Sequence, residues 1–148
     1  MKKFLFTAML AMMSLTWVSC ESKVILEGEL PQTAQSFVQQ HFADYTVGQV
    51  LKDWDHGHAE YEVYLSQGAD IFVLDFNHKG EIKAIDSKSK TALPESVIPA
   101  KILEYTAANY PANFIIEWDK DKRDQSVELN NGIDLVFSLA GDFLRIDY

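Results

Sequence analysis

The chain alternates between segments with helical and with strand-like hydrophobic spacing. Between residues 30 and 43, apolar residues recur three and four positions apart, which predicts an amphipathic helix after Leu30-Pro31. The following stretches are apolar at every second position or continuously, which predicts strands at 46–55, 61–66, 71–76 and 81–86. Short turns that contain Gly68 and Gly80 separate the last three. The first half therefore predicts one helix followed by four antiparallel strands.

The same order returns in the second half. A helix is predicted from Pro99 or Ala100 to about Asn109, because proline is tolerated at the first helical position but not inside a helix. Strands are predicted at 114–119, 126–129, 133–139 and 142–147. When the second half is shifted onto the first, Trp118-Asp119 falls on Trp54-Asp55 and Gly132 falls on Gly68. This correspondence indicates an internal repeat.

The repeat predicts an α+β fold of two tandem modules, each a helix plus a four-stranded antiparallel sheet. The helices should cover one face of a joined, curved sheet. The first module is predicted at residues 30–86 and the second at 93–148, with a hydrophilic linker at 87–91 between them. Residues 21–29 are predicted to be a polar tether.

The N-terminus has the pattern of an export signal. Lys2 and Lys3 precede an uncharged apolar run, which makes residues 1–20 a predicted signal peptide. The run is shorter than the roughly 20 apolar residues of a membrane-spanning helix. Cys20, the only cysteine, ends it, and Val18-Ser19-Cys20 resembles a bacterial lipoprotein box. We expect a lipidated Cys20 in the periplasm or on the outer membrane, with membrane contact only through the lipid; ordinary cleavage near Cys20 is the alternative.

The charge of the chain restricts its partners. The net charge is −9, and removing Lys2 and Lys3 from the 13 basic residues leaves 11 basic against 22 acidic residues. Nucleic acids need a basic patch, so we expect no nucleic-acid partner. An acidic surface mainly supports solubility, and a basic partner is the weaker alternative.

The sheet face away from the helices is the predicted binding surface. Residues 71–74 and 133–137 are apolar at both strand parities, so we expect an exposed apolar patch there. Aromatic residues are enriched at binding hot spots, although large aromatic residues are more often core residues. The candidates for the binding face are Tyr64, Trp54, Trp118, Phe72 and Val136.

The sequence contains no motif for a catalytic nucleophile, a phosphate-binding loop, a dinucleotide or a zinc protease. We therefore expect no catalytic residue, no cofactor and no enzyme activity. His56 and His58 would lie on the same side of a strand, and together with neighbouring aspartates they are candidates for zinc or copper ligands. A solvated turn is the simpler interpretation, because the matching place in the second half holds Lys120-Asp121-Lys122.

The repeated strands, of the pattern YEV-L-x-x-G-x-D-I/L, follow paired Leu-Pro helix starts and a signal peptide. Together they resemble the PepSY-like, β-lactamase-inhibitor-like exported proteins of Gram-negative bacteria, over roughly residues 30–148. The resemblance implies two tandem α/β modules, a periplasmic or lipoprotein location and, as a rule, no enzymatic activity. Inhibitor proteins of this shape bind enzymes on the open sheet face. No residue motif for β-lactamase inhibition is present, so that activity is not transferred.

The expected function is therefore that of a non-catalytic exported binding module. It would recognise a protein or peptide of the cell envelope through the open sheet face, in an inhibitor-like manner. The alternative is a small-molecule or metal-ion binding protein of the periplasm.

Overall fold

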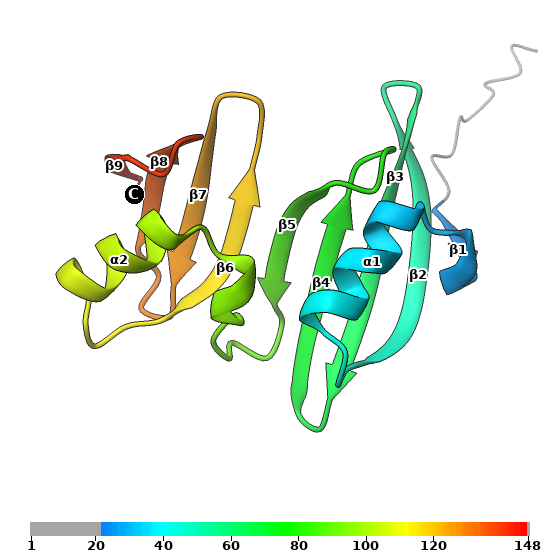
Figure 1. The fold of residues 1–148 in the computed structure, drawn as a ribbon, viewed down its shortest axis with the longest axis horizontal. Coiled ribbons are helices and arrows are strands. Elements are labelled where there is room, and N and C mark those ends of the chain that lie inside the picture. The colour runs from blue at the N-terminus through cyan, green and yellow to red at the C-terminus, as the bar shows by residue number, and fades with distance from the viewer. Residues whose placement is uncertain (1–21, 148) are drawn as a thin grey trace, which may run out of the picture.

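One antiparallel sheet of nine strands runs through the whole molecule (Figure 1). The structure is a computed structural model and describes residues 22–147. Each strand pairs with the next in the chain, so the order across the sheet is the order in the sequence. The strands are β1 (Lys23–Ile25), β2 (Thr46–Asp55), β3 (His58–Gln67), β4 (Asp70–Phe76), β5 (Ile82–Ser87), β6 (Ile115–Lys120), β7 (Asp124–Leu129), β8 (Asp134–Ser138) and β9 (Phe143–Asp147).

Two helices of equal length, α1 (Gln32–His41) and α2 (Ala100–Asn109), lie on the same face of this sheet (Figure 1). A short 3-10 turn precedes each helix, at Glu27–Glu29 and at Glu95–Val97. Pro31 and Pro99 stand immediately before the two helices, where a missing amide hydrogen costs nothing. Among the described residues, no helix has the length and apolar character needed to cross a membrane.

The prediction of a tether at residues 21–29 is wrong for most of its length. Lys23–Ile25 form strand β1, which pairs with Val50–Lys52 of β2, and Ile25 is buried in the core. Three residues are too short to show a strand period, and the pairing depends on a distant strand. Among the described residues, the sheet therefore begins at Lys23, before the predicted start of the first module at Leu30.

The hydrophobic core lies between the two helices and the sheet. Helix α1 contributes Ala34 and Val38, and α2 contributes Ile102. The core continues without a break under both helices, because β5 and β6 are paired through Ala84–Asp86 and Glu117–Asp119. The fully buried strand residues of this core are Val63, Leu65, Phe72, Leu74, Phe76, Ile85, Val127, Leu129, Leu135 and Phe137.

Two candidates for the binding face belong to this core instead. Phe72 is 1% exposed and packs against Phe42 and Tyr45, with ring centroids 5.8 and 5.4 Å apart. Trp118 is 4% exposed and donates its indole hydrogen bond to Gln125 Oε1, at 3.1 Å. Both side chains have the parity that points toward the helices, so neither can meet a partner on the open face.

Candidate functional site

The face of the sheet opposite the helices carries a row of carboxylates on five consecutive strands. The register places Asp86 of β5 directly across from Glu117 of β6, and Glu117 across from Glu128 of β7. Glu128 in turn faces Asp134 of β8, which faces Asp147 of β9. We call these five residues the acidic row.

Directly opposed residues in an antiparallel sheet have Cα atoms about 4.5–5.5 Å apart, so like charges there repel each other. Burial and the neighbouring Asp86 and Glu128 raise the pKa of the Glu117 carboxyl above its usual value. Burial, Glu128 and Asp147 likewise raise the pKa of Asp134. The acidic row therefore places like charges directly beside one another across five strands.

A second group of acids lines a hollow of about 230 Å³ on the same face, between β1 and β6. At its floor Asp75 lies directly opposite Glu62. Burial and the charge of Glu62 raise the pKa of Asp75 to about 6, although Lys83 acts in the opposite direction. A hydrogen bond to Glu62, together with burial, raises the pKa of Tyr64 to about 12.

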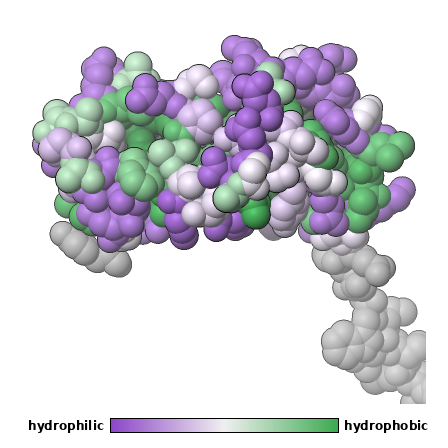
Figure 2. Space-filling model, turned by 90° about the horizontal axis from the view of Figure 1, so that it is seen from below, coloured by the Kyte–Doolittle hydropathy of each residue, from purple (hydrophilic) through white to green (hydrophobic). Residues whose placement is uncertain are grey.

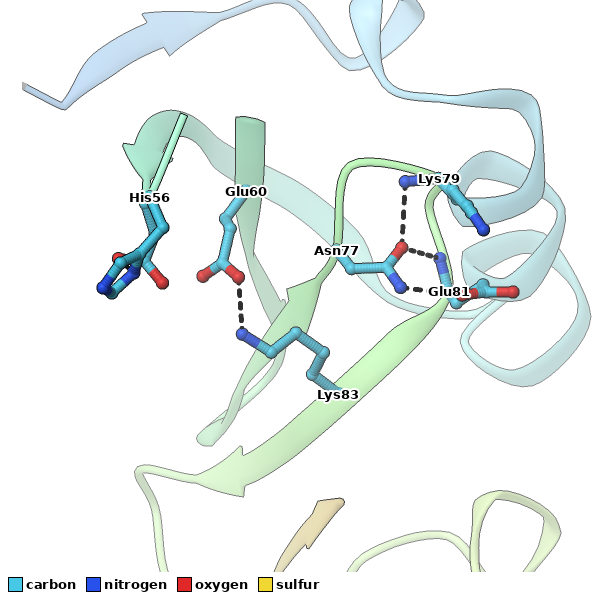
Figure 3. Close-up of polar contacts among 7 residues, drawn as sticks. His56, Glu60, Asn77, Lys79, Glu81 and Lys83 are labelled. Atoms are coloured by element: carbon cyan, nitrogen blue, oxygen red, sulfur yellow. Dashed lines mark hydrogen bonds and ion pairs between the residues drawn. The ribbon is translucent and has the colours of Figure 1, made fainter. Parts of the chain in front are cut away.

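Four basic side chains contact acids of this face but do not balance them. Lys88 pairs with Asp86, and Lys90 lies 3.9 Å from a Glu128 oxygen. Arg145 Nε donates to Asp147 Oδ1 at 3.0 Å. Lys83 Nζ donates to Glu60 Oε1 at 2.6 Å (Figure 3). Among the described residues, no basic residue forms an ion pair with Glu117, Asp134, Glu62 or Asp75.

The apolar patch that the sequence predicted on this face is absent from the described residues. Val73 and Val136 point to this side but are buried, and Tyr64 is half-buried beside Val73. Among the large apolar side chains of β3–β8, Ile71 is the one that is exposed on the open face. Figure 2 looks along the sheet from below Figure 1 rather than onto this face, and in that view hydrophilic and hydrophobic residues are mixed. In the register Val73 lies between Tyr64 and Asp86, and Val136 lies between Ser126 and Arg145, so polar side chains flank both buried valines.

Trp54 is exposed, but it lies on the helix side of the sheet. It pairs with Ala59 near the tip of the β2–β3 hairpin and has the parity of the core residue Val50. The Lys52 ammonium lies 5.3 Å from the centroid of the Trp54 ring and 5.8 Å from that of Tyr61. Trp54 is therefore a surface aromatic at one end of the molecule and not a part of the open face.

The two predicted histidine ligands do not converge. His56 sits in the hairpin turn with a positive φ of 47° (Figure 3). Its Nδ1 atom lies 2.6 Å from Asp55 Oδ1. His58 instead stacks on His78 from the β4–β5 turn, with ring centroids 4.8 Å apart. Within residues 22–147 there is no group of three or more histidine, cysteine or acidic side chains arranged to hold a metal ion.

The β4–β5 turn that bears His78 is fixed by one amide side chain. Asn77 Oδ1 accepts hydrogen bonds from the backbone N–H groups of Lys79 and Glu81, at 2.9 and 3.0 Å (Figure 3). Its Nδ2 donates to Glu81 Oε2 at 2.7 Å. Glu81 is therefore already engaged in the turn. Cys20, the predicted lipidation site, lies outside the described residues.

Comparison with known proteins agrees with this architecture. The model of the family described as "Putative beta-lactamase-inhibitor-like, PepSY-like" matches residues 14–74 and 59–145. The chain belongs to this family. No curated protein sequence matches it.

Three solved structures are similar to this PepSY-like chain, each with a TM-score of 0.78. A "putative periplasmic protein" from Bacteroides vulgatus is 33% identical, over 88% of this chain and 99% of that one. A "putative calcium-regulated periplasmic protein" from Bacteroides thetaiotaomicron is 34% identical, over 86% and 97%. A second Bacteroides vulgatus protein, described as being "of unknown function", is 28% identical, over 86% and 100%.

Proposed function

We propose that this PepSY-like protein is a non-catalytic binding protein of the periplasm that recognises a basic protein or peptide through its open sheet face. The acidic row carries this proposal. Opposed like charges destabilise a sheet, and a sequence that keeps five of them in register gains no packing in return. Features that weaken a fold without structural benefit are typical of functional sites.

The chemistry of the face also defines the partner. Lysine and arginine side chains placed over the row would neutralise Glu117 and Asp134, which have no basic neighbour in an ion pair within residues 22–147. Complementary charge accelerates association and excludes wrongly charged partners. Two open faces of this protein would repel each other, so a second copy is a poor occupant. The proposed contact with the partner is therefore electrostatic, in place of the apolar contact that the sequence suggested.

The arrangement of the chain supports the finer features of the proposal. Helix α1 precedes β2–β5 and α2 precedes β6–β9, as two copies of one module would require. Both helices are on one side, which leaves the other side of all nine strands open to a partner (Figure 1). The similar structures are described as periplasmic, which agrees with a signal peptide at residues 1–20.

A pair of charge variants tests the proposal. Glu117→Gln, Glu128→Gln and Asp134→Asn are combined to neutralise the acidic row. Asp44→Asn, Glu95→Gln and Glu104→Gln remove the same charge from exposed positions near the helices. The probe is a fluorescein-labelled peptide of alternating lysine and serine, and the readout is fluorescence anisotropy. We expect the row variant to bind at least about tenfold more weakly and the control variant to bind as the wild type does.

Equal weakening in the two triple variants would show that only the net charge matters and would contradict a specific site on the open face. Added salt should weaken wild-type binding, because the contact is between exposed charges. If the peptide does not bind the wild type at all, the partner is not recognised by its positive charge and the proposal fails.

A divalent cation is the second candidate for the same row. Carboxylates are the preferred ligands of calcium, and one similar structure is described as "calcium-regulated". No ready-made cage exists among the described residues, so calcium would bridge neighbouring carboxylates. In that case calcium chloride would raise the unfolding temperature of the wild type more than sodium chloride at equal ionic strength, and the row variant would lose this difference.

A further inference from the structure

The hollow on the open face holds two carboxylates that face each other across neighbouring strands. Asp75 of β4 lies directly opposite Glu62 of β3, and on its other side it lies opposite Ala84 of β5. Like charges that are directly opposed in a sheet repel each other, and the methyl group of Ala84 cannot offset that repulsion. Leu51 of β2 also lines the hollow and adds an apolar wall. The register therefore places an acid and an alanine, but no base, directly beside Asp75.

Among the described residues that line the hollow, Lys83 is the one base, and it is already engaged. Its Nζ atom donates to Glu60 Oε1 at 2.6 Å (Figure 3). Lys88, which follows β5, pairs with Asp86. The titratable and charged groups around Asp75 are Glu60, Glu62 and Tyr64 of β3, Lys83 and Asp86 of β5 and the adjacent Lys88, with Asp53 of β2 and Asp119 of β6 on the walls of the hollow. Acids therefore outnumber bases around Asp75.

This environment makes Asp75 a proton-binding group at mildly acidic pH. Burial and the charge of Glu62 raise the pKa of the Asp75 carboxyl to about 6, against the opposing effects of Lys83 and Lys88. At pH 6 about half of the molecules therefore hold a proton on Asp75. An ammonium or guanidinium group placed near a carboxylate favours the ionised form and lowers its pKa. A basic side chain of the partner that enters the hollow would thus drive this proton off.

We infer that the hollow couples recognition of the basic partner to the release of a proton from Asp75. The inference deepens and rests on the proposed function, because it needs a lysine or arginine of the partner to enter the hollow. The O–H bond of the Asp75 carboxyl breaks, the proton passes to the solvent, and the carboxylate that remains pairs with the cation of the partner. The open face consequently holds the partner more tightly at neutral pH than at acidic pH, where Asp75 keeps its proton.

Isothermal titration calorimetry with the lysine–serine peptide tests the inference. The titration is made at pH 6 in morpholinoethanesulfonate and in imidazole, two buffers with different enthalpies of ionisation. The difference between the two observed binding enthalpies then gives the number of protons released. We expect the wild type to release about 0.3–0.5 proton per peptide at pH 6 and much less at pH 7.5. The dissociation constant should fall by about fivefold to tenfold between pH 5 and pH 7.5.

Matched substitutions assign the proton to Asp75. Asp75→Asn should lose most of the release at pH 6, whereas Asp44→Asn, the same change in an exposed turn, should keep it. Glu62→Gln removes the directly opposed charge and should shift the release to lower pH. Lys83→Met removes the opposing base and should shift the release to higher pH. Residues that only shaped the hollow would not move the release in opposite directions.

Two results would overturn the inference. One is peptide binding to the wild type at pH 6 without release of a proton, and the other is a release of equal size in Asp75→Asn. In both cases the peptide still binds through its charge, so the proposed function is unaffected. A peptide that binds at no pH would contradict the proposed function and the proton coupling together, so the two failures are distinguishable.

Discussion

At the scale of the residue, Asp75 is a carboxyl group of the open face whose charged form destabilises the fold. It interrupts the apolar run Ile71–Phe76 of β4 and lies between Glu62 on one neighbouring strand and Ala84 on the other. Its pKa of about 6 means that its ionised form is less stable in the folded protein than in the unfolded chain. The carboxylate therefore weakens the fold at neutral pH.

Asp75→Asn should stabilise the protein in a pH-dependent manner. The unfolded chain releases the Asp75 proton near pH 3.8 and the folded protein near pH 6, so stability is lost as the pH rises through this window. The substitution should raise the free energy of unfolding by about 1–3 kcal/mol at pH 7.5. The gain should be much smaller at pH 4, where Asp75 is already neutral in the folded protein.

Urea unfolding at the two pH values measures this effect, with Asp44→Asn in an exposed turn as the control. A gain from Asp75→Asn that is the same at pH 4 and pH 7.5 would show that ionisation of Asp75 is not its cause.

The residues of the open face show what a sequence can and cannot specify. Asp75 is visible in the sequence as the only charge within an apolar run. Its partner Glu62 is not, because that contact depends on the register of two strands. Phe72 and Val73 are both apolar, and only the position of the helices decides that Phe72 faces inward. The acidic row needs the pairing of β5 with β6, which no turn sequence encodes.

At the scale of the element, each helix rests on a glycine in the last hairpin of its half. Gly80 of the β4–β5 turn has a φ of 78°, and a Cβ atom there would lie 2.8 Å from the backbone nitrogen of Ala34 in α1. Gly141 of the β8–β9 turn has a φ of 86°, and its Cβ would lie 2.9 Å from Lys101 Cβ in α2. The two glycines hold matching places in the two halves, since each lies two residues before the last strand, β5 or β9.

Gly80→Ala should therefore destabilise the protein more than Gly132→Ala. Both glycines have positive φ angles, at 78° and 81°, so each alanine is strained by about 1–2 kcal/mol. Gly132 has no atom within 4 Å of an added Cβ, whereas Gly80 would have to displace the backbone of α1. We expect a total cost above about 3 kcal/mol for Gly80→Ala, measured by urea unfolding. Equal costs for the two variants would mean that α1 moves away without penalty.

The elements were predicted best where the hydrophobic pattern extends over many residues. The sequence placed α2 at residues 99 or 100 to 109, and the structure has Ala100–Asn109. The glycine turns likewise set the hairpins of β3–β5 and β7–β9. Strand β1 was missed, because three residues carry no measurable period and are recognised only by their pairing with β2.

At the scale of the whole molecule, the contact between β5 and β6 turns two similar halves into one sheet. Ile85 of β5 lies directly opposite Trp118 of β6, and both are buried in the shared core. One further contact connects the halves outside the strands: His41 Nδ1 of α1 lies 3.1 Å from Ser96 Oγ in the 3-10 turn before α2.

This shared core predicts that the two halves unfold together. In a Trp54→Phe background, Trp118 fluorescence reports on the junction, while far-ultraviolet circular dichroism reports on all helices and strands. Because neither half can expose Ile85 or Trp118 without opening the core of the other, both signals should change at the same urea concentration.

Ile85→Ala should lower the free energy of unfolding by about 2–5 kcal/mol, since it leaves a cavity at the junction. The common urea midpoint of both signals should fall accordingly. Ile71→Ala makes the same chemical change at an exposed position and should cost much less. A fluorescence transition that precedes the circular dichroism transition would instead mean that the junction opens first and that the open face is a hinged pair of sheets, too mobile to hold the acidic row in register.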